Sequence, residues 1–180
     1  MKKKLNSSFR KIAEGICITT IVCTCGMLTG CSDDGYKEPI NMVAEGWSEN
    51  DSDKIIESMF SAEMIEESDD PDFLDDIDYA TDSWVEYFAD KYGNDFEMYF
   101  ELNKPIELSE KKLENYQEFY DSELGIDIEL KKGYKVKAKM VVEGDKDSDS
   151  YDGYEFMILN VQGEGWRIYP AEGCLYKLYF

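Results

Sequence analysis

The chain has 180 residues, of which 40 are acidic, 19 are basic and none is histidine, and its formal net charge is −21. A polyanion of this size disfavours binding to nucleic acid, because phosphate contacts require clustered lysine and arginine. The absence of histidine excludes Ser-His-Asp and Cys-His nucleophilic arrangements, histidine-ligated metal sites and histidine-ligated haem. Any catalysis would therefore depend on carboxylates and tyrosines.

The first thirty residues differ in composition from the rest. Residues 2–11 contain five basic side chains and no acidic one, and Ile16 to Leu28 is a mostly apolar run. This order is typical of a secretory signal peptide, residues 1–30. As a helix the apolar run would rise about 20 Å, whereas a hydrocarbon core is roughly 30 Å thick, so a transmembrane helix is the less favoured alternative.

The apolar run ends in Leu28, Thr29, Gly30 and Cys31. This sequence resembles the lipobox of bacterial lipoproteins, in which an aliphatic residue and two small residues precede a cysteine. The resemblance implies that the Cys31 thiol is diacylated and that a peptidase cleaves the chain just before it. The protein would then be anchored in the bacterial cell membrane on its extracytoplasmic face, where two acyl chains suffice for stable attachment.

Cleavage before Cys31 would leave a net charge of −25, because residues 1–30 contain five basic residues and one acidic residue. Only Cys31 and Cys174 would remain of five cysteines, so we do not expect a disulfide-stabilised secreted domain. Residues 31–46 are polar and acidic, which predicts a tether that lifts the domain off the membrane. The folded domain is predicted to comprise residues 47–180.

Helical patterns come first in the predicted domain. Apolar side chains recur at intervals of three and four between residues 51 and 67, with Asp51 or Ser52 as the helix cap. Residues 63–78 hold nine acids and no base, so we interpret them as a solvated, partly helical connector, with an ion site as the alternative. A second helical pattern follows and ends at Gly93.

Beyond Gly93 the period of the apolar residues changes to two, which predicts strands. Residues 126–130 and 134–142 both alternate, and two arrangements fit them: a hairpin with Gly133 in a left-handed turn, or one long bulged strand through Lys132. A capped helix is predicted before them, beginning at Ser109. The remaining predicted segments are a strand at 96–102, a turn at 144–153, a strand at 154–161 and a last strand at 166–170.

Helices followed by a meander of strands predict an α+β domain, with the N-terminal helices packed on a curved antiparallel sheet of about four to five strands. The order of the elements and the closing phrase "GEGWRIYP", with Trp166 at its centre, resemble the small bacterial lipoproteins of the NTF2-like (cystatin-like) α+β superfamily. The resemblance implies a conical pocket between helix and sheet, which is an active site in some relatives and a binding site in others. Both an open and a filled cone are compatible with the sequence, and the fold alone does not select the function.

Alternate aspartates occur in the turn at 144–153, at Asp145, Asp147 and Asp149, with Asp152 beyond them. They resemble the first half of a calcium loop, which supplies hard oxygen ligands. However, Ser150 stands where such a loop requires glycine, and the bidentate glutamate is missing. We favour a solvated hairpin tip, with a calcium site of millimolar affinity as the alternative. We expect no other cofactor.

Three lysines, Lys135, Lys137 and Lys139, share one face of the strand predicted at 134–142. They could form a positive strip for an anionic partner, but we favour a solvent-exposed face that Asp127, Glu129 and Glu155 neutralise. Taken together, the sequence predicts a non-catalytic, lipid-anchored extracytoplasmic domain that binds a partner protein or a small ligand in the cell envelope. The alternatives are a carboxylate–tyrosine enzyme in the cone and a calcium-dependent adhesion module.

Overall fold

The computed structural model describes residues 34–68 and 73–170, apart from the side chain of Phe73. The predicted signal peptide and Cys31 lie outside the described residues, as does Cys174. The described elements are, in chain order, η1 (Asp34–Lys37), α2 (Glu38–Glu49), α3 (Ser52–Met59), α4 (Ala62–Glu67), α5 (Phe73–Tyr92), β1 (Glu97–Leu102), β2 (Ile106–Glu107), α6 (Glu110–Leu124), β3 (Leu130–Glu143), β4 (Ser148–Val161) and β5 (Gly165–Ile168).

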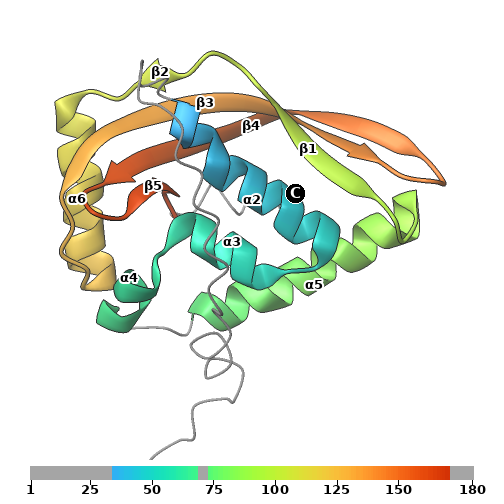
Figure 1. Ribbon diagram of the computed structural model, residues 1–180, viewed down its shortest axis with the longest axis horizontal. Coiled ribbons are helices and arrows are strands. Elements are labelled where there is room, and N and C mark those ends of the chain that lie inside the picture. The colour runs from blue at the N-terminus through green and yellow to red at the C-terminus, as the bar shows by residue number, and fades with distance from the viewer. Residues whose placement is uncertain (1–33, 69–72, 171–180) are drawn as a thin grey trace, which may run out of the picture. The chain divides into compact units, whose positions relative to one another are not determined.

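The strands form one antiparallel sheet in the order β1-β3-β4-β5, and β2 pairs with the same strand β3 as β1 does. The sheet is curled, and the long strands β3 and β4 arch over α2 and α3 (Figure 1). The described part of the chain thus contains five α-helices and a sheet of five strands. This confirms the predicted α+β fold, with helices on a curved antiparallel sheet of four to five strands.

Strand β3 runs without interruption through the residues for which a hairpin was one alternative. The register of its pairing with β4 shifts between Leu130 and Lys132, which marks a bulge. Gly133 does not adopt the left-handed region, and a Cβ atom there would lie 2.7 Å from Leu108 Cδ1 and 2.9 Å from Leu113 Cδ2. The glycine is thus needed for close packing and not for a turn. The long bulged strand is confirmed, and the hairpin is wrong.

The predicted tether is wrong from residue 34 onward, because η1 and α2 are part of the folded domain. Pro39 lies in the first turn of α2, where the N–H that proline lacks would have no partner within the helix. Gly46 allows α3 to approach closely, since a Cβ atom on it would lie 2.6 Å from Ile55 Cγ1. The buried residues of the segment are Tyr36, Pro39, Ile40, Val43, Ala44, Gly46 and Trp47. The fold therefore includes residue 34 and does not begin at 47.

The start of α3 and the end of α5 follow the predicted signals, whereas the break between α3 and α4 was not predicted. Asp51 caps α3 by accepting a hydrogen bond from the backbone N–H of Lys54 at 3.3 Å, and Ser61 caps α4 in the same way. The single helical pattern at 51–67 is thus two short helices. Gly93, with a φ of 109°, follows the end of α5, as its position after the helical pattern predicts.

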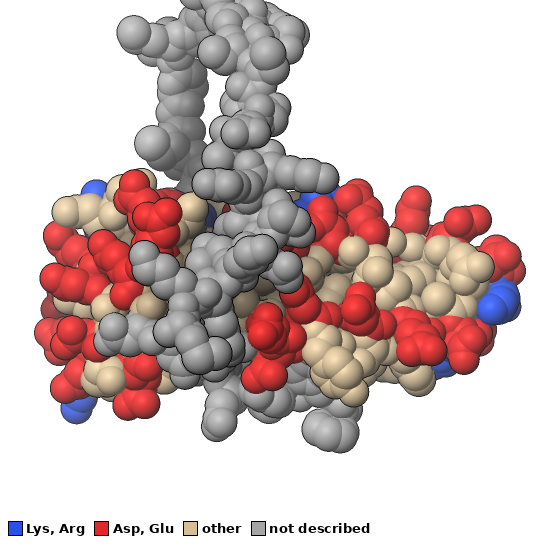
Figure 2. All heavy atoms as spheres, turned by 90° about the horizontal axis from the view of Figure 1, so that it is seen from below, with Lys and Arg blue, Asp and Glu red and all other residues tan. Residues whose placement is uncertain are grey.

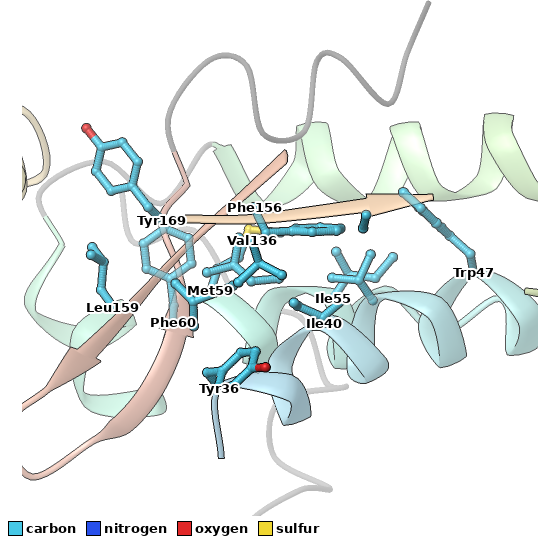
Figure 3. Close-up of a cluster of buried hydrophobic side chains, with 14 of the residues drawn as sticks. Tyr36, Ile40, Trp47, Ile55, Met59, Phe60, Val136, Phe156, Leu159 and Tyr169 are labelled. Carbon is cyan, nitrogen blue, oxygen red and sulfur yellow. The ribbon is translucent and has the colours of Figure 1, made fainter. Parts of the chain in front are cut away.

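The concave face of the sheet packs against α2 and α3. Figure 3 shows Ile40, Ile55 and Met59 on these helices beside Val136 and Phe156 of the sheet. Each of these five side chains is at most 2% exposed. Burial of one such side chain is worth about 1.5–3 kcal/mol, so this layer is a main source of stability. The described part of the concave face is therefore filled by the protein's own side chains.

Candidate functional site

The convex face of the sheet carries the three lysines of the predicted positive strip. Lys135, Lys137 and Lys139 alternate along β3 with Val136 and Ala138, which are buried on the other face. This alternation follows from the period of two in a strand. The prediction that the lysines share one face is confirmed.

Acidic side chains on the neighbouring strands flank these lysines. Lys135 Nζ lies 2.5 Å from Glu155 Oε1 on β4, and Lys139 Nζ lies 3.6 Å from Glu101 Oε2 on β1. Glu155 is also opposite Lys137 in the β3–β4 register. Partly exposed ion pairs of this kind contribute at most about 1 kcal/mol each. The face is therefore flanked by carboxylates, but of the three expected acids only Glu155 lies beside the lysines. Asp127 and Glu129 precede β3, and Glu101 of β1 supplies the other carboxylate.

A groove of about 350 Å³ is lined by residues of β1, β3 and β4 and by Asn103, which follows β1. The charged residues that line it are Glu101, Lys137, Lys139, Asp152 and Glu155. Its volume is at the small end of the range for small-molecule pockets, which are mostly apolar, whereas this groove presents charges of both signs. The lining favours a partner with complementary charges over an apolar ligand.

A β-bulge at Gly153 shapes this groove. The register changes from Ala138 opposite Tyr154 to Lys139 opposite Asp152, so that Gly153 is an extra residue in β4. Its φ of 98° lies in the region that favours glycine. Sequence reasoning placed this glycine in a turn and missed the bulge, because only the pairing with β3 reveals it.

The four aspartates of the possible calcium loop do not converge on one point. Asp145 lies against the end of α5, since a Cβ atom on Gly93 would be 1.6 Å from its Oδ1 atom. Asp147 accepts a hydrogen bond at 2.9 Å from the backbone N–H that follows it. Asp149 pairs with a lysine of α5, whereas Asp152 lines the groove. Among the described residues, no group of three or more acidic, cysteine or histidine side chains is placed to hold a metal ion.

A polar cluster that sequence reasoning missed joins the end of α5 to β4. Lys91 Nζ donates a hydrogen bond to the Tyr151 hydroxyl at 2.7 Å and another to Asp149 Oδ2 at 3.3 Å. The hydroxyls of Tyr92 and Tyr151 are hydrogen bonded to each other. The signal that could have found the cluster is Tyr151 itself, the aromatic residue among the aspartates and serines of the predicted turn.

The electrostatics of this cluster keep Lys91, Tyr92 and Asp149 in their ordinary protonation states at neutral pH. Burial raises the pKa of Tyr92 to about 12. Hydrogen bonds to Tyr151 and Tyr92 raise the pKa of Lys91, while the backbone N–H of Ser150 and the Lys91 ammonium lower the pKa of Asp149. Efficient proton transfer requires a pKa near the working pH. These shifts therefore suit a structural contact that holds the end of α5 against β4 better than a catalytic acid or base.

A second tyrosine–carboxylate pair is exposed to solvent. The Tyr99 hydroxyl donates a hydrogen bond to Glu143 Oε1 at 3.1 Å, and the Tyr99 side chain is 42% exposed. A carboxylate is tuned into a general base mainly by burial or by a charged neighbour. The geometry around Glu143 provides little burial, so this pair does not resemble a catalytic dyad.

Within the described parts of the chain, no helix is both long enough and apolar enough to cross a membrane. The lipobox residues Leu28, Thr29, Gly30 and Cys31 lie outside those parts, so their role stays a prediction. In comparisons with protein-family models, curated proteins and solved structures, nothing matches this chain.

Proposed function

We propose that this protein is a lipid-anchored extracytoplasmic domain that binds a partner protein in the cell envelope and catalyses no reaction. The observation that carries the proposal is the packing of the concave face, where the NTF2-like resemblance would place a ligand or an active site. Ile40, Ile55 and Met59 occupy that space. The helices on the concave side of a curled sheet also support the resemblance to NTF2-like and cystatin-like domains as a description of the fold.

The groove on the convex face is the surface we propose for the partner. It combines lysines and carboxylates in fixed positions, and such charges select a partner of complementary charge and fix its register. Two exposed apolar side chains lie on the strands at this side of the sheet, Tyr99 at 42% and Ile106 at 59% exposure. Aromatic and apolar anchors surrounded by charged groups are the usual composition of a protein–protein interface.

Site-specific photo-crosslinking in intact cells tests the partner site. A photoreactive residue at Lys137, in the groove, should give a discrete protein adduct, whereas the same residue at Glu114, exposed on α6, should not. Adding Lys139→Glu should reduce the adduct, because it would place a third carboxylate beside Glu101 and Asp152. Equal adducts at both positions, or an adduct that Lys139→Glu leaves unchanged, would contradict the proposed site.

Metabolic labelling with a radioactive fatty acid tests the anchor. The change Cys31→Ala should abolish the label and block cleavage before residue 31, because the thiol is the proposed acyl acceptor. Cys174→Ala is the matched control and should retain both, since it removes the other cysteine of the mature chain. Labelled, processed protein from the Cys31→Ala variant would refute the anchor.

A further inference from the structure

Helix α5 buries one side and leaves the opposite side in solvent. Ile77, Thr81, Phe88 and Tyr92 are at most 7% exposed and belong to the buried side. Successive residues of a helix are rotated by about 100°, which places a different set of residues on the opposite side. All nine members of that set are exposed, and we call them the outer face of α5: Asp75, Asp76, Asp78, Tyr79, Asp82, Ser83, Glu86, Tyr87 and Asp90.

The outer face of α5 carries two of the four exposed large hydrophobic side chains in the described part of the chain. Tyr79 is 76% exposed and Tyr87 is 50% exposed. They are about 12 Å apart along the helix, with the small Ser83 between them. The Tyr87 ring contacts the rings of Trp84 at 5.7 Å and Phe88 at 5.4 Å, which hold it in position. Exposed aromatic side chains in fixed positions are typical anchors of protein interfaces.

A row of four carboxylates runs beside the two tyrosines. Asp78, Asp82, Glu86 and Asp90 follow one another at intervals of four residues. Side chains at this spacing are neighbours on a helix surface, and like charges there destabilise the helix. Figure 2 views the molecule from below, the side on which α5 lies in Figure 1, and shows acidic side chains over much of the visible surface. The row therefore adds repulsion to a surface that is already strongly acidic.

The lysines near α5 do not neutralise this row. Lys91 pairs with Asp149 on β4. Lys146 donates hydrogen bonds to the backbone carbonyls of Ala89 and Asp90 at the end of the helix. Within the described residues, no carboxylate of the row forms an ion pair. Such an uncompensated local conflict is expected where a surface serves a function.

Helix α6 lacks this combination of aromatic and acidic side chains. Its exposed acids share the helix with Lys111 and Lys112. Its aromatic side chains, Tyr116, Phe119 and Tyr120, are all at least partly buried. The pairing of exposed tyrosines with an unneutralised acidic row thus distinguishes α5 and is not a general property of the acidic helices.

We propose that the outer face of α5 binds a helix of a partner protein that carries arginines beside apolar side chains. The carboxylates and the tyrosines form two parallel rows, and a ridge of side chains on a partner helix fits between such rows. An arginine there pairs with a carboxylate while its guanidinium stacks on a tyrosine ring, which a lysine does less well. Its charge also relieves the repulsion within the row. This surface is separate from the convex groove and goes beyond the partner site proposed above.

Fluorescence anisotropy with the purified full chain tests the tyrosines. The probe is a labelled alanine-based helical peptide of about 18 residues, with arginine and leucine in adjacent rows. Tyr79→Gln should weaken binding roughly threefold, the effect of one exposed cation–π contact, although the net charge is unchanged. Tyr99→Gln is the matched control, because Tyr99 is an exposed tyrosine outside α5, and it should bind normally. The same peptide with lysine for arginine should bind more weakly.

Paired neutral variants test the acidic row. Asp82→Asn with Glu86→Gln should weaken binding about fivefold, as expected for the loss of two exposed ion pairs. Glu114→Gln with Glu118→Gln removes the same charge from α6 and should have a much smaller effect. All four carboxylates are exposed, so we expect both paired variants to fold.

The outcomes separate this proposal from simpler attractions. Binding that Tyr79→Gln leaves unchanged, or that falls equally in the α5 and α6 variants, would reflect net charge alone and would overturn the proposal. Displacement of the peptide by calcium at constant ionic strength would overturn it in favour of a metal site. Lys139→Glu alters the convex groove and should not weaken binding; a loss would place the peptide in the groove and overturn the α5 site alone. Crosslinking at Lys137 does not depend on α5, so either proposal can fail without the other.

Discussion

Replacing Ile40 by alanine tests whether the segment expected to be a tether belongs to the core. Ile40 is fully buried on α2, with 0% of its side chain exposed, and faces the concave side of the sheet. Truncation of a buried isoleucine to alanine costs about 2–5 kcal/mol, because the removed atoms leave a cavity. Alanine is the better helix former by a few tenths of a kcal/mol, which offsets little of this loss. We therefore expect a loss of about 3 kcal/mol.

Thermal and urea unfolding followed by circular dichroism measure this loss. At roughly 2–4 °C per kcal/mol, the midpoint should fall by about 10 °C, and the urea midpoint should fall without a change in the m-value. Asn41→Ala is the matched control, since Asn41 is the next residue of α2 and is exposed; it should change stability by less than about 0.5 kcal/mol. If Ile40→Ala unfolds like Asn41→Ala, residues 34–46 contribute nothing to the core and the tether prediction was right.

Two further predictions concern the junction between α5 and the β3–β4 hairpin. Gly144→Ala should lower the free energy of unfolding in urea by about 1–3 kcal/mol, because its Cβ atom would lie 2.1 Å from the backbone oxygen of Tyr92. The control is Gly163→Ala, whose Cβ atom would meet open space and whose φ of 88° should cost only about 1 kcal/mol of backbone strain. Equal losses in the two variants would contradict the clash. The pKa of Tyr92 is raised from 10.0 to about 12, so its contribution to stability is complete below pH 10 and is lost as the pH rises toward 12. In urea midpoints measured from pH 8 to 12, Tyr92→Phe should flatten this decline, and an unchanged pH profile would contradict the assignment.

Local patterns were sufficient where a segment's own neighbours determine its structure. The alternation of Met98, Phe100 and Leu102 with polar residues and Tyr99 correctly predicted β1, and Gly93 correctly marked the end of α5. The segment at 31–46 carried a helical pattern as well, with Ile40 and Val43 at the expected spacing. Its acidic residues, glycine and proline are more typical of a loop, and it contains too few apolar residues for their spacing to indicate a helix clearly.

Patterns failed where contacts between distant segments decide the structure. Lys131, Lys132 and Gly133 form a plausible local turn, but the strand continues because Leu108 and Leu113, from the β2–α6 region, pack against Gly133. The groove was equally hidden, since it depends on which residues of β1 and β4 lie beside each lysine of β3. The lysines themselves were found, because the period of two places them on one face whatever their partners are.

The bulge at Gly153 shapes both the convex groove and the polar cluster that holds the end of α5 against β4. Without the extra residue, strict alternation from the buried Phe156 would turn Asp152 inward and Tyr151 outward. With it, Asp152 faces outward beside Lys139, and Tyr151 and Asp149 face inward, where both contact Lys91. One glycine with a left-handed backbone thus forms a wall of the groove and also directs the hydrogen bonds that hold the end of α5. This division also explains why the aspartates that resemble a calcium loop in sequence lie on different sides of the sheet.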